Sequence, residues 1–180
     1  MKLTPWQMIR SEQPFAQLRI DDCQLPSGRV IRKLIHEYSP WATILAITSQ
    51  NEVVLVRQYR HGIQATTLEL PGGVVDEGEK ALAAAQRELM EETGYGAGVW
   101  TFLGSPSPNP DNHTNRIHCF LAKDVEKIDS IALDHDEELE ILLVPYNEML
   151  KMALSGKLPQ AMHLAALFLA QPYLSIKYEP

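Results

Sequence analysis

The chain has 180 residues, of which 45% are hydrophobic and 22% charged, and a formal net charge of −7 at pH 7. This composition is typical of a globular domain and excludes collagen-like, low-complexity and largely disordered proteins. The acidic balance argues against a nucleic acid polymer as partner, because neutralising many phosphates needs clustered Lys and Arg. A small phosphorylated ligand is compatible with it if divalent metal ions or a local cationic pocket offset the repulsion.

The sequence shows no segment typical of a membrane anchor or of export. No run reaches the roughly 18 consecutive apolar residues that a membrane helix needs, and the first residues lack the apolar core of a signal peptide. Cys23 and Cys119 lie far apart, and we interpret them as free thiols of a reducing compartment. We therefore expect a cytoplasmic protein without a membrane partner.

Residues 1–38 read as short strands interrupted by turns. The strand candidates are residues 15–20 and 29–36, and the Pro-Ser-Gly segment at 26–28 is a turn between them. We expect this part to form a small strand-rich β extension of a main domain that spans residues 39–180.

The main domain begins with two strong strand candidates. Residues 41–48 and 53–59 are rich in β-branched side chains and flank a polar connector, which predicts an antiparallel pair. Residues 66–70 form a further strand that runs into Pro71-Gly72-Gly73. From about Glu79 to Glu92 the apolar pattern becomes helical, and Thr93-Gly94 is a stop signal. The remaining elements are strands at 99–103, 117–123 and 139–144, a Pro- and Asn-rich loop at 105–112, and helices at 147–155 and 159–170.

Three carboxylates gather near the C-terminal end of the first helix. Glu88 lies three residues before Glu91 and four before Glu92, so all three lie on or beside one helix face. Like charges at this spacing repel, and the helix dipole disfavours anions at this end. Hard divalent cations such as Mg2+ prefer carboxylate oxygens and would compensate for both effects. Acidic helix ends are also commonly plain solvated surface, so the three residues alone leave both interpretations open.

The wider spacing favours the metal site. The segment from Gly73 to Tyr95 matches the pattern G-x5-E-x7-R-E-U-x-E-E-x-G-U, in which U is a bulky apolar residue and Tyr95 fills the last place. On this pattern the chain resembles the Nudix hydrolase superfamily. The Leu-Val-Arg-Gln-Tyr-Arg segment at 55–60, the Leu-Glu-Leu-Pro-Gly-Gly segment at 68–73 and the prolines at 105–110 resemble its ADP-ribose pyrophosphatase-like branch.

The resemblance implies an α/β fold, an α/β/α sandwich around a mixed sheet, and hydrolysis of a nucleoside diphosphate linked to another group. Glu88 and Glu92 match the principal metal ligands, with Glu91 adjacent, and the carbonyl of Gly72 matches a backbone ligand. Arg87 matches a residue that orients the carboxylates, with Glu79 paired near the helix start. Arg87 and Glu91 are therefore catalytic candidates too. The expected cofactor is Mg2+, with Mn2+ as a substitute.

A general base and phosphate-binding side chains are also required. In the branch that the chain resembles, a downstream Glu on a mobile loop is a ligand or base, and Glu137, with Glu138 as second choice, stands at the matching place. An ordinary acidic loop is the alternative. Arg57 and Arg60 lie on opposite faces of one strand, so only one can point into the pocket. The resemblance favours Arg60 over a surface salt bridge, and Arg116 is a further phosphate candidate.

The function expected from the resemblance is Mg2+-dependent hydrolysis of ADP-ribose or another nucleotide sugar to a nucleoside monophosphate and a sugar phosphate. Two alternatives stay open. One is the same chemistry on GDP-mannose, a dinucleoside polyphosphate or a modified nucleotide, and the other is a sensor that binds a nucleotide sugar without turnover. Residues 1–38 resemble the extension through which this branch forms dimers, so we expect a homodimer whose partner chain completes each site.

Overall fold

The computed structural model describes residues 7–15, 17–130 and 139–174. Contacts divide the chain into two compact units, Met1–Ser39 with Ser107–Arg116 and Pro40–Pro106 with Ile117–Pro180, and each is described by itself. Within the described ranges, no helix has both the length and the apolar character that crossing a bilayer requires.

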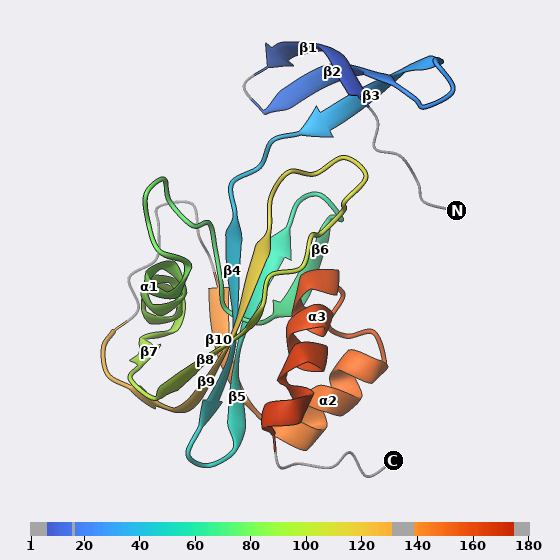
Figure 1. Ribbon diagram of the computed structural model, residues 1–180. Coiled ribbons are helices and arrows are strands. Elements are labelled where there is room, and N and C mark those ends of the chain that lie inside the picture. The colour runs from blue at the N-terminus through green and yellow to red at the C-terminus, as the bar shows by residue number, and fades with distance from the viewer. Residues whose placement is uncertain (1–6, 16, 131–138, 175–180) are drawn as a thin grey trace. The chain divides into compact units, whose positions relative to one another are not determined.

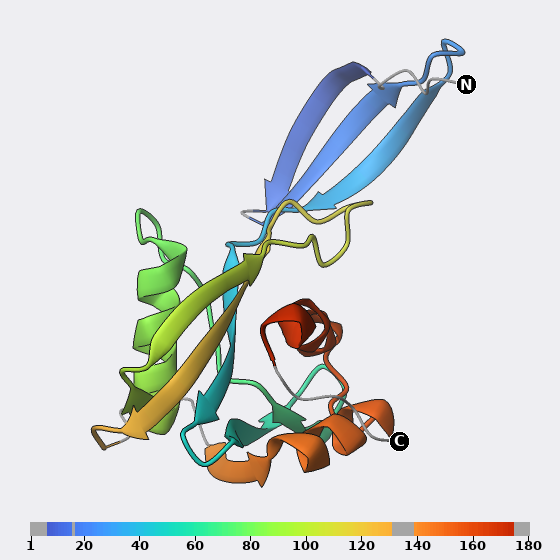
Figure 2. The same ribbon diagram turned by 60° about the horizontal axis from the view of Figure 1, so that its bottom comes forward.

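The first unit is a three-stranded antiparallel sheet in the order β1-β2-β3, whose strands lie side by side in Figure 2. The strands are β1 (Gln7–Phe15), β2 (Leu18–Gln24) and β3 (Val30–His36). The expected strand at 15–20 is wrong, because β1 ends and β2 begins inside that range. Pairing between the strands sets these limits: Phe15 pairs with Leu18 across a tight reversal that the mixed local pattern did not reveal.

Residues 107–116 also belong to the first unit, although the sequence analysis placed them in the main domain. The His36 N–H donates to the Asn112 carbonyl at 2.7 Å, and the Thr114 N–H donates to the His36 carbonyl at 3.0 Å. Lys33 adds an ion pair with Asp111 at 2.6 Å. These bonds attach the Pro- and Asn-rich loop to the end of β3.

The second unit is built on a seven-stranded mixed sheet with the order β10-β5-β4-β9-β7, in which β6 pairs with β5 and β8 with β9 (Figure 1). The strands β4 and β9 run parallel, whereas β4–β5, β5–β6, β5–β10 and β8–β9 run antiparallel. The strands are β4 (Trp41–Thr48), β5 (Glu52–Arg60), β6 (Ala65–Glu69), β7 (Tyr95–Gly96), β8 (Val99–Gly104), β9 (Ile117–Lys127) and β10 (Leu139–Pro145).

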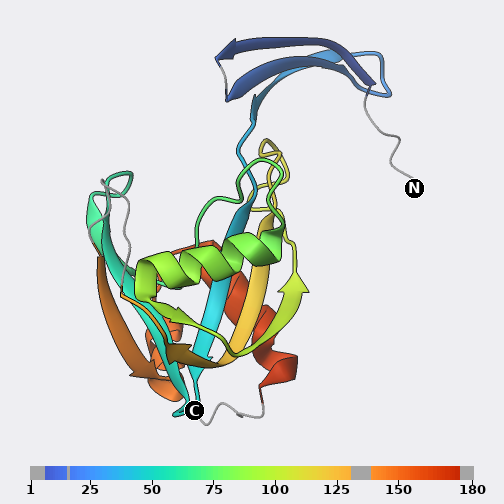
Figure 3. The ribbon, with the colours of Figure 1, turned by 90° about the vertical axis from the view of Figure 1, so that its left-hand side faces the viewer.

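Helices cover both faces of this sheet (Figures 1 and 3). The helix α1 (Ala81–Thr93) lies on one face, and α2 (Tyr146–Leu154) and α3 (Ala161–Ala170), followed by a 3-10 turn at Gln171–Tyr173, lie on the other. The expected α/β/α sandwich is therefore confirmed, as are the antiparallel pair of β4 with β5 and the helix that follows the glycine-rich loop.

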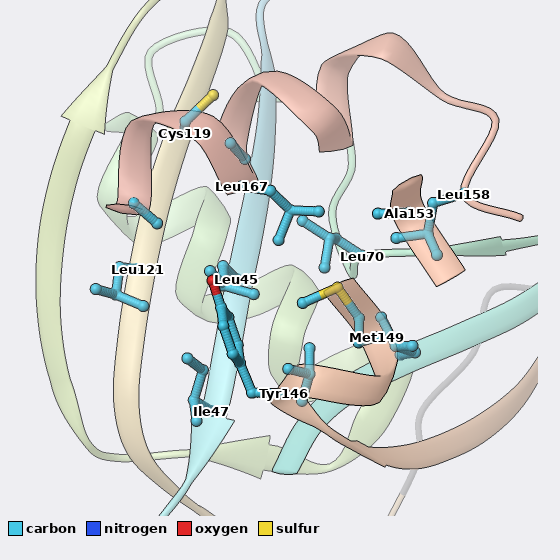
Figure 4. Packing of buried hydrophobic residues seen from close by; sticks show 14 of the residues in the cluster. Leu45, Ile47, Leu70, Cys119, Leu121, Tyr146, Met149, Ala153, Leu158 and Leu167 are labelled. Atoms are coloured by element: carbon cyan, nitrogen blue, oxygen red, sulfur yellow. The ribbon is translucent and has the colours of Figure 1, made fainter. Parts of the chain in front are cut away.

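The central strand β4 has apolar side chains on both faces of the sheet, so both faces must pack against helices. Ile44 belongs to the core cluster of α1, whereas Leu45 and Ile47 belong to the cluster of α2 and α3, because successive strand residues point to opposite faces. In the second cluster Leu45 lies among Tyr146 and other side chains from both helices (Figure 4). Burying each large apolar side chain contributes about 1.5–3 kcal/mol. This packing fixes α1 against one face of the sheet.

Candidate active site

The loop between β6 and α1 is attached to β4 by backbone hydrogen bonds. The Ala42 N–H donates to the Gly73 carbonyl at 2.8 Å, and the Ile44 N–H donates to the Pro71 carbonyl at 3.0 Å. Gly72 lies between them with φ +152°, and a Cβ there would lie 2.1 Å from the Ala42 carbonyl oxygen. A side chain at position 72 would therefore push the loop off the sheet.

The helix α1 presents its acidic residues beside its buried face. Leu89 and Glu92 are both buried, and Gly94 ends the helix in the left-handed conformation with its N–H bonded to the Met90 carbonyl at 2.7 Å. The last turn contains no basic residue. The carboxylates there thus meet the unfavourable end of the helix dipole without a basic residue in the last turn to offset it.

The guanidinium of Arg87 holds three carboxylates of the segment from Gly73 to Tyr95. It contacts both oxygens of Glu79 at 3.1 and 3.2 Å, one oxygen of Glu88 at 2.8 Å and one of Glu91 at 2.9 Å. It also donates to the Val74 carbonyl at 3.0 Å. Hydrogen bonds that Arg87 donates to Glu79, above all, and to Glu91 and Glu88 raise the pKa of Arg87, although burial opposes them. Arg87 therefore remains charged and fixes the direction of the acidic side chains.

Gly72 and Gly73 of the loop lie next to the carboxylates of Glu92 and Glu88. The Gly72 N–H donates to an oxygen of Glu92 at 2.9 Å. A Cβ at Gly73 would lie 2.3 Å from the carboxyl carbon of Glu88, so that the missing side chain leaves the space that this carboxylate occupies. The glycine pair of the loop and the acidic face of α1 consequently meet at one place.

A cavity of about 270 Å³ opens at this place. Its walls come from three parts of the second unit: β4 and β5, the loop before α1, and the acidic face of α1. The lining residues are Trp41, Gln58, Arg60, Gly72, Gly73, Val74, Asp76, Arg87, Glu88, Glu91 and Glu92. The structure thus brings together the expected metal ligands, Arg87 and one of the expected phosphate-binding arginines.

The donor set of this cavity fits a hard divalent cation. Carboxylate oxygens and a backbone carbonyl are the ligands that Mg2+ takes in proteins. Among the described residues, no three acidic, His or Cys side chains converge closely enough to hold an ion as they lie. In this structure Arg87 holds Glu88 and Glu91, and the Gly72 amide holds Glu92. Each carboxylate offers two oxygens, so Glu88, Glu92 and the Gly72 carbonyl would hold a cation after small side-chain rotations, with Glu91 at its side.

Arg60 and Arg57 lie on opposite faces of β5, as their spacing predicts. Arg60 lines the cavity and is paired with Glu69, a buried carboxylate at the end of β6. Arg57 lies outside the lining and forms a 2.7 Å ion pair with Glu140 of β10, in which both side chains are exposed. Arg57 thus forms a surface salt bridge in this structure, and the roles of both arginines in binding phosphate stay predictions.

The other candidates lie elsewhere in the chain. Arg116 is exposed and belongs to the first unit. Glu137 and Glu138 lie outside the described residues, so their role as general base stays a prediction.

The sequence analysis missed several residues of the site. Gln58 lines the cavity, and strand alternation from Arg60 could have revealed it because the two residues are two apart on β5. Glu69 stood in the quoted motif without a role, and a carboxylate inside an apolar strand was the signal that it is paired. Trp41 gave no comparable signal, since an aromatic residue at the start of a strand is ordinary.

Comparisons with known proteins agree with this geometry. The NUDIX domain family matches residues 38–164. A methanol dehydrogenase activator of Bacillus methanolicus is 33% identical over 155 residues, which cover 83% of this chain and 84% of that protein. An ADP-ribose pyrophosphatase of Bacillus subtilis is 30% identical over 166 residues, which cover 89% of this chain and 90% of that protein.

Among solved structures, a crystal structure of an ADP compounds hydrolase has the same fold. It matches with a TM-score of 0.84 over 97% of this chain and 96% of that chain, at 24% sequence identity. The chain belongs to the Nudix family, within the pyrophosphohydrolase branch that is like ADP-ribose pyrophosphatase.

Proposed function

We propose that the chain hydrolyses ADP-ribose or a related nucleotide sugar, with a divalent cation, to a nucleoside monophosphate and a sugar phosphate. The observation that carries this proposal is the cavity in which Glu88, Glu91 and Glu92 face Gly72 while Arg60 supplies a cation on another wall. Such a cavity has the charge pattern that a diphosphate needs: acidic groups for metal ions and a guanidinium for phosphate oxygens. The relative named ADP-ribose pyrophosphatase supports the choice of substrate class.

The residues of the chain have separable tasks in this reaction. Arg60 binds phosphate oxygens, and Arg87 keeps Glu88 and Glu91 directed at the cavity. A divalent cation held by Glu88, Glu92 and the Gly72 carbonyl, Mg2+ or Mn2+, would neutralise the diphosphate and lower the pKa of the attacking water. The water oxygen forms a bond to one phosphorus while the bond from that phosphorus to the bridging oxygen breaks. Glu137, or Glu138 as second choice, takes the proton of the water.

The test is a panel of nucleoside diphosphate derivatives assayed with Mg2+, with Mn2+ and with a chelator. We expect ADP-ribose to be cleaved to AMP and ribose 5-phosphate with either metal, and no cleavage with the chelator. Wild-type protein that cleaves no member of the panel would contradict the proposal.

Two alternatives are separated by the same panel. The acidic face and Arg60 contact only the metal and diphosphate part of a substrate, so GDP-mannose, a dinucleoside polyphosphate or a modified nucleotide fits them equally. The highest kcat/KM in the panel identifies the substrate. A protein that binds ADP-ribose but cleaves nothing would be a sensor; the buried Glu92 beside Glu88 argues against this, because a binder has no need of clustered carboxylates.

We also propose a cytoplasmic homodimer formed through residues 1–38. The support is indirect: both cysteines are free, and β3 carries exposed large apolar side chains, Val30 and Leu34. A second copy of the chain would cover such a strand face.

A further inference from the structure

A second carboxylate of the site region, Glu69, is buried far more deeply than the acidic face of α1. It is 1% exposed and stands at the end of β6, directly before Leu70-Pro71-Gly72. A buried carboxylate is unfavourable unless it is paired and hydrogen-bonded. The hydrogen-bond partners of Glu69 therefore indicate its role.

Glu69 is paired with Arg60 in a bidentate fork. The Arg60 Nε donates to one carboxylate oxygen at 2.9 Å and its Nη2 donates to the other at 2.6 Å. The fork uses two of the five N–H donors of a guanidinium and fixes its plane. Because Arg60 also lines the cavity, the fork holds the charged end of the side chain at the cavity wall.

Two further side chains hold the carboxylate from other elements. The Thr67 hydroxyl of β6 donates to it, and the Gln160 amide at the start of α3 donates to it at 2.6 Å. Nearby, the Nδ1 atom of His163 in α3 accepts the Leu70 N–H at 2.7 Å. The end of β6 is thus attached to α3 at two neighbouring residues, which leaves Glu69 little freedom to follow Arg60 if the latter moves.

Electrostatics keeps this arrangement charged. Burial would raise the pKa of Glu69, but hydrogen bonds from Arg60 and Thr67 outweigh it and hold the pKa below its ordinary value. The pair is consequently a fixed carboxylate and a guanidinium, not a neutral acid beside a mobile cation.

We propose that Glu69 is a positioning residue that acts through Arg60 and directs its guanidinium to the diphosphate of the substrate. This inference rests on the proposed function, since it takes the diphosphate as the ligand of Arg60. A long Arg side chain at the end of a strand loses conformational freedom when it binds a ligand, and Glu69 removes that freedom beforehand. The benefit is expected in substrate affinity and not in the bond-breaking step.

The competing explanation is that Glu69 only stabilises the fold. In that case Glu69→Gln lowers the melting temperature but leaves the affinity of the folded protein unchanged. A positioning role instead predicts a change in affinity that depends on the presence of Arg60, which a structural role does not produce.

The experiment measures equilibrium binding of α,β-methylene ADP-ribose, which cannot be hydrolysed at the bridge, in the presence of Mg2+. The proteins are wild type, Glu69→Gln, Arg60→Ala and the double variant. Glu140→Gln is the matched control, because Glu140 also pairs with an arginine of β5 but stands outside the cavity. We expect Glu69→Gln to weaken binding about tenfold, the size expected for one lost hydrogen bond to a charged group.

Three further results are expected. Arg60→Ala weakens binding at least as much, the double variant binds like Arg60→Ala alone, and Glu140→Gln binds like wild type. In steady-state assays Glu69→Gln raises KM about tenfold and changes kcat by less than about threefold. Affinity of Glu69→Gln equal to wild type, or losses that add in the double variant, would overturn the inference.

Gln160→Met provides a second variant in case Glu69→Gln does not fold. It removes one donor to the carboxylate while keeping the charge pair, and we expect a two- to fourfold loss of affinity, about the effect of one weakened hydrogen bond. An unchanged affinity would contradict the positioning role. If wild type binds the analogue but cleaves no substrate, the proposed function fails. The affinities of the single and double variants for the analogue still decide this inference. If wild type does not bind the analogue, both fail.

Discussion

At Gly73, the absence of one methyl group decides where the Glu88 carboxylate can lie. A Cβ there would approach the Glu88 carboxyl carbon to 2.3 Å, so Gly73→Ala must displace the carboxylate. Since the displaced group is the end of a flexible side chain, the fold should survive. We predict a loss of turnover of about 10–100-fold, the size found when a ligand-orienting contact is lost.

The matched control for this variant is Gly62→Ala. A Cβ at Gly62 has nothing within 4 Å. Its turnover should equal that of wild type. Gly73→Ala with full turnover would show that the position of Glu88 does not matter.

Glu92 differs from the other carboxylates of the site because it is buried and bonded to the Gly72 amide. Glu92→Gln keeps an oxygen acceptor for that amide but removes the negative charge. We therefore predict a fall in kcat of about 10²–10³-fold with a melting temperature within a few degrees of wild type. Glu148→Gln, a change at an exposed residue of α2, is the control. A Glu92→Gln variant that retains turnover would remove Glu92 from the metal site.

At the scale of elements, the contact between α3 and the end of β6 depends on a neutral histidine. Burial lowers the pKa of His163 from 6.5 to about 4; the Glu69 carboxylate opposes this shift and Arg60 adds to it. Because the unfolded chain binds this proton more readily, His163 contributes stability that is complete above about pH 6.5 and is lost as the pH falls toward 4. The expected loss is up to about 3 kcal/mol.

The measurement is urea unfolding between pH 7.5 and 4.5 for wild type and His163→Gln. The glutamine can accept the Leu70 N–H but does not titrate. We expect a steep fall in the free energy of unfolding for wild type and a shallower one for the variant. Equal slopes would mean that His163 is not the titrating group.

The elements themselves were predictable where the signal is local. The end of α1 follows from Gly94, whereas the helix begins at Ala81, two residues after the expected start. The strand β4 follows from a continuous run of apolar and β-branched residues that are buried on both faces. The two-residue strand β7 is too short to produce a periodic pattern, and the break between β1 and β2 depends on pairing between strands.

The site was predictable to a similar extent and for the same reason. Glu88, Glu91 and Glu92 follow one another on a single helix, so their meeting can be derived from spacing. Two partners of Glu69, Arg60 and Gln160, stand 9 residues before it, on β5, and 91 residues after it, just before α3, and only the folded chain brings them together. A pattern along the chain cannot show such a contact.

At the scale of the whole molecule, the proposed dimer makes a specific prediction. Leu34 of β3 is 47% exposed in the single chain, and burying the rest of this side chain in both copies would stabilise the dimer by about 1.5–3 kcal/mol in total. We predict that the full chain elutes with twice its own mass in light-scattering chromatography. Leu34→Glu should raise the dimer dissociation constant at least about tenfold.

Leu154→Glu is the control for the dimer, because Leu154 is 66% exposed but lies at the end of α2 in the other unit. This variant should elute with the same molecular mass as the wild-type dimer. A wild-type chain that elutes as a monomer, or a dimer that Leu154→Glu separates and Leu34→Glu does not, would contradict association through residues 1–38.

The central claim is that the acidic face of α1 and the loop before it hold a divalent cation against a diphosphate. The most direct test is a crystal structure with Mn2+ and α,β-methylene ADP-ribose, in which anomalous scattering locates the metal. The account predicts an ion bound by Glu88, Glu92 and the Gly72 carbonyl, at about 2.0–2.6 Å, and also bound to a phosphate oxygen. A diphosphate bound elsewhere, or bound here with Glu88 and Glu91 still on Arg87 and no ion between them, would contradict it.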